Sequence, residues 1–343
     1  MQPKISVIIP VYNVYQYISD CLDSIFCQDI DNSCYEVIVV DDCSPYGEKA
    51  IVDTYIKKYT NIKYIRHNVN KRQGGARNTG LRIACGEYIM FIDADDFLIH
   101  RNVFSILLHY ANKHNSVVLR SESYQIFSQS THYKNLEKIF INVDKIKYTV
   151  SNFKKWRSGN ISCSACSTLY KRIFLLENNL FFRENVLFED TDWVQKTMYY
   201  ATNIDFINIP FYGYRQSVNS TTRGYSIAAF EGNIDGIIET FRFFKEIEFD
   251  NTMREFLNEG FTKNVIGVLK TSSNYPIQKS HDILNKLNIC GVTSIKSKSS
   301  KSRCILYMMR YVPLFPIAIV KFSVSIKRIF KMRAIKNLLC KIS

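Results

Sequence analysis

The sequence predicts an α/β fold in which a mostly parallel central sheet with flanking helices is followed by a helical C-terminal region. In the first third of the chain, short apolar runs typical of buried strands alternate with stretches of helical spacing. Polar residues follow these runs directly, at Asn13, at Asp41 and Asp42, and at the acidic cluster of residues 93–96. Ligands of such sheets bind at the carboxyl ends of strands, so these polar positions are candidate site residues.

Each element is predicted by its own local pattern. The strand-like runs are residues 5–9, 35–40, 62–66, 88–92, 117–119 and 204–209. Apolar residues at helical spacing predict helices within residues 14–30, 51–59, 74–84 and 103–110. The stretch 121–158 has a mixed, polar pattern, for which we predict neither a helix nor a strand. From residue 226 onward the pattern is mainly helical.

The charge of the chain is concentrated at its C-terminal end. The 343 residues carry a net charge of +14, from 45 basic and 31 acidic side chains. Residues 283–343 contain 13 Lys or Arg and no Asp or Glu, which leaves 32 basic and 31 acidic residues in the rest of the chain. A neutral body with a basic tail indicates an acidic partner surface, either nucleic acid or anionic lipid.

The basic tail has the composition of a membrane-surface segment. Residues 304–320 are apolar but contain Arg310, Pro313 and Pro316, whereas a spanning helix needs ~20 apolar residues without charge. An apolar stripe among Lys and Arg follows, which is typical of an interfacial helix on anionic lipid. The stripe is Phe322, Ile326, Ile329 and Phe330. The alternative is a solvated tail; nucleic-acid binding is disfavoured, because the cations are interleaved with aliphatic residues. We therefore expect three parts, 1–225, 226–293 and 294–343.

The start of the chain and its cysteines indicate a cytosolic protein. Met1 leads almost directly into a strand, without a signal peptide pattern. The ten cysteines are scattered without a disulfide framework. The single Cys163-x-x-Cys166 pair has no further ligands nearby for zinc, so we expect reduced thiols.

Four motifs occur in one order: SVIIPVYN at 6–13, VVDDCS at 39–44, GGARNTG at 74–80 and FIDADD at 91–96. This series resembles the family 2 glycosyltransferases, which have the GT-A nucleotide-sugar-binding fold. The resemblance is close over residues 4–100. It extends to about residue 225 through FED at 188–190 and Tyr214-Arg215. Any single motif is modest support, but four in order are a specific signal.

The resemblance implies a nucleotide-sugar site formed along the four motifs together with Arg215. The residues it implies are Pro10, Tyr12, Asn13, Asp42, Arg77, Asp93, Asp95 and Arg215. Asp42 would accept the uracil N3–H, although one of Asp41 and Asp42 can serve only to shape a turn. Arg77 would face the nucleotide and sugar. Arg72 occupies the position of a family glycine, which either alters the loop path or adds a second phosphate-facing charge.

The acidic cluster is the implied metal site. By the resemblance, Asp95 and Asp96 hold Mn²⁺ or Mg²⁺, with Asp93 close by. Carboxylate oxygens are the donors that these hard cations prefer. A divalent cation would neutralise the diphosphate leaving group. The alternative for these residues is a solvated acidic loop after a strand.

The implied catalytic base is Asp190, with Glu189 or Asp192 as substitutes. Inverting transfer needs one carboxylate to take the proton of the acceptor hydroxyl. An Asp at a helix start is also a good cap, and the two roles are compatible. Arg215 would clamp phosphate oxygens of the donor, and the alternative is a solvated loop arginine.

The expected function is that of a metal-dependent inverting glycosyltransferase, transferring a hexosyl or N-acetylhexosaminyl group. The donor would be a nucleotide sugar, expected to be UDP-linked. The acceptor would be a lipid-linked oligosaccharide of capsule, exopolysaccharide or O-antigen synthesis. The tail would hold the enzyme peripherally on the cytoplasmic face of the cell membrane. Two alternatives stay open: a non-catalytic membrane-surface protein with the same fold, and a nucleotidyltransferase, which would need a glycine-rich loop after the first strand.

Overall fold

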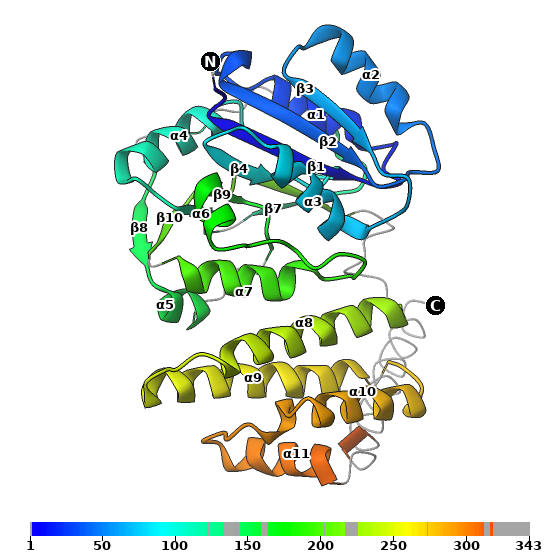
Figure 1. Ribbon diagram of the computed structural model, residues 1–343, viewed down its shortest axis with the longest axis vertical. Coiled ribbons are helices and arrows are strands. Elements are labelled where there is room, and N and C mark those ends of the chain that lie inside the picture. Colours follow the sequence, from blue (N-terminus) through cyan, green and yellow to red (C-terminus); the bar gives the residue numbers. More distant parts are fainter. Residues whose placement is uncertain are drawn as a thin grey trace, which may run out of the picture. The chain divides into compact units, whose positions relative to one another are not determined.

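The computed structural model describes residues 2–122, 124–133, 141, 145–158, 164–201, 203–216, 226–272, 274–311 and 316–317 (Figure 1). The chain divides into two compact units, Met1–Gly224 and Tyr225–Ser343. Each unit is described by itself. The expected stripe at 322–330 and Cys163 lie outside the described residues.

The first unit is built on an eight-stranded sheet with the order β3-β2-β1-β4-β9-β6-β10-β8. Its strands are β1 (Ile5–Val11), β2 (Tyr35–Asp41), β3 (Ile62–Arg66), β4 (Tyr88–Phe91), β6 (Val118–Ser121), β8 (Tyr148–Ser151), β9 (Thr168–Lys171) and β10 (Ile204–Ile207). All pairings are parallel except those of β9 with β4 and β6 and of β8 with β10. Every residue of β1 and β2 is buried, which is why these strands are continuous apolar runs. The predicted mostly parallel sheet is confirmed.

Helices cover the sheet of this unit. They are α1 (Ile18–Phe26), α2 (Glu48–Lys58), α3 (Arg72–Ile83), α4 (Val103–His114), α5 (Phe153–Ser158), α6 (Arg172–Glu177) and α7 (Asp190–Tyr200), with a 3₁₀ turn at Asn32–Cys34. The rings of Phe26 in α1 and Tyr59 after α2 stack at 3.9 Å, which joins these two helices. Helix α3 packs on β1 and β2 and lies in front of them in Figure 1. Gly80 permits this approach, because a Cβ there would clash with Cγ2 of Ile8.

The strand order reverses at β1, because β2 and β3 follow on one side of it and β4 lies on the other. Ligand sites of open α/β sheets form at such a reversal, outside the carboxyl ends of the strands. Asn13, Asp42 and the acidic cluster all lie at this edge. A second sheet of order β5-β11-β7 begins directly after the cluster. Its strands are β5 (Phe97–Leu98), β7 (Gln125–Ser128) and β11 (Tyr212–Gln216).

The second unit is helical, as predicted for the C-terminal region. It contains α8 (Ile227–Lys245), α9 (Asn251–Ser272), α10 (Ile277–Ile289), a 3₁₀ turn at Val292–Ser294 and α11 (Ser300–Tyr311). One apolar core joins these helices through residues such as Ile234, Val265, Leu284 and Met309. Across the described ranges, no helix combines the length and the apolar character needed to cross a bilayer.

The close packing of α3 on β1 yields a first prediction. Gly80→Ala should lower the free energy of unfolding by about 1–3 kcal/mol, because the added methyl group overpacks the contact with Ile8. Tryptophan fluorescence in urea measures this in the first unit, where both tryptophans lie, at 156 and 193.

Gly267→Ala in α9 is the matched control, because an added Cβ there meets nothing within 4 Å. It should leave the tryptophan transition unchanged. An unaltered transition in Gly80→Ala would contradict the close packing of α3 on the sheet.

Candidate active site

A cleft of about 740 Å³ opens at the carboxyl ends of β1, β2 and β4. The site residues predicted from the sequence line it, apart from Arg215 and the substitute base Asp192. They are Pro10, Tyr12, Asn13, Asp42, Arg77, Asp93, Asp95, Asp96, Glu189 and Asp190. The cleft is large enough for a small-molecule ligand of nucleotide-sugar size.

Asp42 lines the cleft and has one carboxylate oxygen that receives no hydrogen bond from the described residues. Its Oδ1 shares a hydrogen bond with Nδ1 of His67 at 2.7 Å and accepts one from the backbone N–H of Lys71 at 2.8 Å. Its Oδ2 is buried and accepts no hydrogen bond from the described residues. A buried carboxylate oxygen without a donor is costly, so this atom is suited to an N–H of a ligand.

Asp41, the neighbouring carboxylate, has the structural role. It accepts hydrogen bonds from the backbone N–H of Ser44 at 2.7 Å, from the Tyr64 hydroxyl at 2.5 Å and from Nη1 of Arg66 at 2.7 Å. Burial acts to raise the pKa of Asp41, but these hydrogen bonds and the Arg66 charge lower it below its usual range. The turn function therefore belongs to Asp41, and Asp42 is the member of the pair that lines the cleft.

Arg77 lines the cleft and is only 2% exposed. Its Nη1 pairs with Glu189, and its Nη2 donates to Asp93 Oδ1 at 2.7 Å. Burial acts to lower the pKa of Arg77, but these two carboxylates outweigh it and raise the pKa well above its ordinary value. One guanidinium thus joins α3, the loop after β4 and the start of α7.

Asp96 is buried and positions the acidic loop. Its Oδ2 accepts from the Tyr212 hydroxyl at 2.6 Å, and its Oδ1 accepts from the backbone N–H of Arg215 at 2.8 Å. Burial, together with the negative charges of Asp95 and Asp93, raises the pKa of Asp96 well above its usual range. This carboxylate, predicted as a metal ligand, has both oxygens engaged and ties the loop to β11.

The acidic loop fits a divalent cation that is shared with a ligand. Among the described residues, no group of three or more His, Cys, Asp or Glu side chains forms a complete metal site. Asp95 is partly exposed in the cleft between Asp93 and Asp96. Mg²⁺ is commonly held by one or two carboxylates together with substrate phosphates, so a partial donor set of this kind suits it.

Of the two cleft-lining carboxylates of the FED motif, Asp190 is the one that forms no ion pair with the described residues. It occupies the first turn of α7, while Glu189 takes the N-cap position. Burial, followed by the nearby charge of Glu189, raises the pKa of Asp190 to about 7, despite the opposing effect of Arg77. Asp192, the other substitute, is buried outside the cleft and pairs with Arg183 and Lys196, both at 2.8 Å.

The structure does not bring Arg215 into the cleft. Its side chain is fully buried, and its Nη2 pairs with Asp20 Oδ2 at 2.9 Å. The guanidinium lies over the rings of Tyr17 and Phe97, at 4.9 and 5.2 Å from their centroids. The expected phosphate clamp is thus replaced by a structural ion pair, which anchors β11 to α1.

Several cleft residues have no sequence signal of their own. Tyr124 lies in the segment left without an element, and its ring meets that of Tyr214 edge-on at 5.7 Å. Both line the cleft together with Ser164 and Ser167, which lie near β9 and β6. The cleft therefore continues past β4, away from the half that contains Asp42.

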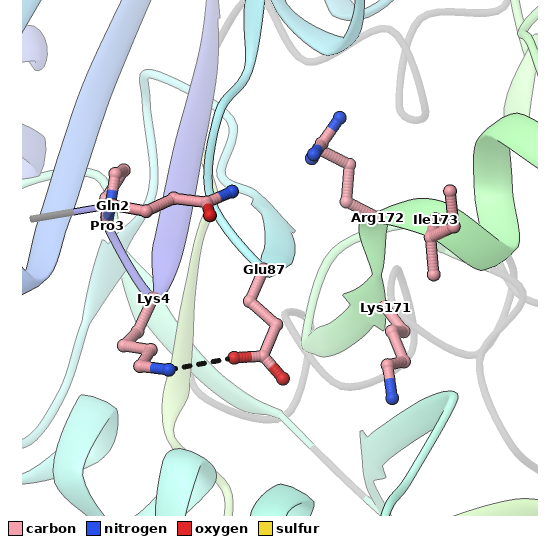
Figure 2. Close-up of a pocket in the computed structure, with 7 residues that line it drawn as sticks. All are labelled: Gln2, Pro3, Lys4, Glu87, Lys171, Arg172 and Ile173. Atoms are coloured by element: carbon pink, nitrogen blue, oxygen red, sulfur yellow. Dashed lines mark hydrogen bonds and ion pairs between the residues drawn. The ribbon is translucent and has the colours of Figure 1, made fainter.

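A smaller cavity of about 250 Å³ lies at the opposite edge of the sheet, where β1 and β4 begin (Figure 2). Lys4 and Glu87 form an ion pair there at 3.1 Å. Lys171 donates to Asn115 and Arg172 to the carbonyl of Gly86, each at 2.8 Å. Its charged groups are satisfied by the protein itself, so we assign no function to this cavity.

Residues 6–176 match the model of glycosyl transferase family 2. Over 96 residues the chain is 47% identical to a poly(ribitol-phosphate) beta-glucosyltransferase of Bacillus spizizenii, an alignment that covers 28% of this chain and 15% of that protein. It is also 26% identical to the putative glycosyltransferase EpsH of Bacillus subtilis, over 96% of this chain and 98% of EpsH.

Solved structures show the same fold. Staphylococcus aureus TarS in complex with UDP-GlcNAc superposes with a TM-score of 0.74 at 22% identity, covering 94% of this chain and 91% of that one. A mannosyltransferase of Pyrobaculum calidifontis in complex with GDP-Man and Mn²⁺ has a TM-score of 0.52 at 17% identity, covering 94% and 88%. The chain belongs to glycosyltransferase family 2 through residues 6–176, and it has the GT-A fold.

The placement of Arg215 gives a second prediction. Arg215→Met should lower the free energy of unfolding by about 3–5 kcal/mol, because among the described residues it leaves the buried Asp20 only the exposed His132, at 3.3 Å, as an ion-pair partner. Urea unfolding measures the loss. Adding Asp20→Asn should recover part of it, since the buried charge is then removed.

Arg82→Gln is the control, because that side chain is half-exposed and pairs only loosely with Glu184 at 3.6 Å. If Arg215→Met had unchanged stability but weaker UDP binding, Arg215 would be a ligand-binding residue of the cleft, and the structural role given to it here would be wrong.

Proposed function

We propose that this glycosyltransferase is a metal-dependent, inverting enzyme that moves a sugar from a UDP-sugar to an acceptor hydroxyl. The observation that carries the proposal is the contrast between the two carboxylates of the FED motif. Glu189 is committed to Arg77, whereas Asp190 lines the cleft with a pKa raised to about 7. A carboxylate with a pKa near neutrality is well matched to general-base catalysis.

The half of the cleft over β1 and β2 is proposed to bind the uridine. Pro10 and Tyr12 form its wall, and Asp42 Oδ2 is the acceptor for the uracil N3–H. The structural relative TarS is described in complex with UDP-GlcNAc, which supports a UDP-linked donor. The sugar would then lie near Asp93 and Arg77, at the reversal of strand order.

Asp95 is the residue that we propose to hold Mn²⁺ or Mg²⁺, with Asp93 beside it. Bound there, the cation would neutralise negative charge on the diphosphate leaving group. Asp96 contributes by holding the loop through Tyr212 and the backbone of Arg215.

In the proposed step, Asp190 removes the proton of the acceptor hydroxyl while that oxygen attacks the anomeric carbon. The new C–O bond forms on the face opposite the leaving group, and the bond between the anomeric carbon and the diphosphate oxygen breaks. The electron pair goes to the nucleoside diphosphate, and the configuration inverts. Because Asp190 must be ionised, the rate should rise with pH through about 7.

The acceptor is proposed to enter from the half of the cleft beyond β4, where Tyr124 and Tyr214 lie. Relatives act on poly(ribitol-phosphate), and on this basis we propose an acceptor that belongs to a cell-surface polymer or its lipid-linked precursor.

We further propose peripheral attachment of the chain to the cytoplasmic face of the membrane. Tyr307 and Tyr311 of α11 are 63% and 58% exposed next to Arg310. Exposed aromatic and basic groups on one helix favour an anionic membrane surface.

The enzyme assay gives a third prediction. UDP release from a panel of nucleotide sugars should occur with one UDP-sugar and Mn²⁺ or Mg²⁺, and should stop with a chelator. Asp95→Asn should weaken metal-dependent UDP binding, which calorimetry measures without turnover. Asp190→Asn should reduce transfer by about 100-fold or more while UDP binding persists.

Asp53→Asn is the control, because this exposed carboxylate on α2 pairs with Lys49 outside the cleft. UDP binding without any turnover, even with polymer acceptors, would favour the non-catalytic alternative. Pyrophosphate release from UTP and a sugar phosphate would favour a nucleotidyltransferase. Absence of metal-dependent UDP binding would refute the proposal.

A further inference from the structure

Arg72 is an exposed arginine that lines the cleft at the start of α3. Its backbone φ is +64°, in the left-handed region that favours glycine. The loop therefore follows the path that a glycine would take there, although a long cationic side chain occupies the position.

An arginine is unfavourable at this point for two reasons. A side chain with a Cβ is sterically disfavoured in the left-handed conformation. A positive charge at the N-terminus of a helix also opposes the helix dipole. α3 has no acidic residue in its first turn to offset that charge. Neither packing nor helix stability explains an arginine at this position. The remaining explanation is that Arg72 binds a ligand of the cleft.

The charges that line the cleft indicate which part of a ligand Arg72 would bind. Arg77 is committed to Glu189 and Asp93, and Arg215 is committed to Asp20. Arg72 forms no ion pair with the described residues. A diphosphate entering a cleft lined by the acidic loop and Asp190 is repelled unless cations compensate, and Arg72 is the arginine available to do so.

The loop that carries Arg72 is also fastened to the proposed base-binding residue. The backbone N–H of Lys71 donates to Asp42 Oδ1 at 2.8 Å, and Nδ2 of Asn70 donates to the Asp42 carbonyl at 3.1 Å. The backbone N–H of Arg72 in turn donates to Asn70 Oδ1 at 3.1 Å. A ligand whose base is held by Asp42 would thus carry its phosphates next to the segment that presents Arg72.

We propose that Arg72 binds the diphosphate of the donor, and that it supplies the cationic contact that the sequence had assigned to Arg215. The inference rests on the proposed function, because it takes the donor to be a nucleoside diphosphate sugar. It assigns to this chain a phosphate contact at a position where the family pattern has glycine. The ligand class is any nucleotide with a 5′-diphosphate.

The test compares UDP with uridine, which lacks the phosphates, by calorimetry at fixed Mg²⁺ and salt. Arg72→Asn and Arg72→Gly remove the charge with residues that tolerate a positive φ. UDP affinity should fall about 10-fold in both variants, as expected for the loss of a charge-assisted contact. Uridine affinity should stay unchanged, and Arg72→Lys should retain part of the UDP affinity.

The matched control is Arg82→Gln, which removes one positive charge from the other end of α3. It should leave both affinities unchanged, and thermal unfolding should show that Arg72→Gly is no less stable than wild type. Equal UDP affinity in wild type and Arg72→Asn would overturn the inference while the proposed function stands. Failure of the wild-type protein to bind UDP at all would overturn both.

Discussion

The ion pairs of Arg77 with Glu189 and Asp93 are the interaction on which the rest of the site depends. A guanidinium buried this completely is stable only when carboxylates compensate its charge. Here the two carboxylates come from the start of α7 and from the loop after β4, so one side chain fixes three elements that are distant in sequence. The same ion pairs also determine which acidic side chains of the cleft can act as a base. Glu189 is engaged by Arg77, whereas Asp190 lines the cleft and forms no ion pair with the described residues.

Buried and exposed arginines have different roles in this unit. Arg77 and Arg215 are enclosed and paired, and each holds one strand or loop in place. Arg72 is exposed, carries backbone strain and lines the cleft. Strain of this kind is retained at functional positions when the surrounding contacts impose it, and the hydrogen bonds of Asn70 and Lys71 to Asp42 are such contacts. Arg77, Arg215 and Arg72 have different roles because they differ in burial, although all three are arginines.

Local patterns were sufficient for the sheet and for most of the cleft. Strands β1, β2 and β4 are apolar runs, and residues that follow them must lie at the carboxyl edge, which placed Asn13, Asp42 and Asp95 correctly. Arg215 of strand β11 could not be placed in this way, because its partner Asp20 is 195 residues away, on helix α1. The choice between Asp41 and Asp42 likewise required the positions of Tyr64 and Arg66. Residues 121–158 gave no periodic pattern, since the exposed strands β7 and β8 have little apolar alternation.

The most direct test of the account is the pH dependence of unfolding for wild type and Asp190→Asn. A carboxyl whose pKa is raised in the folded state destabilises that state when it ionises, and the cost builds up between about pH 4 and pH 7. The stability gained by Asp190→Asn should therefore grow by about 4 kcal/mol over this window and stay constant above it. Asp53→Asn should show no such trend. A pH-independent difference for Asp190→Asn would mean that Asp190 titrates normally, and would contradict the contrast between Asp190 and the Arg77-paired Glu189 on which the choice of base depends.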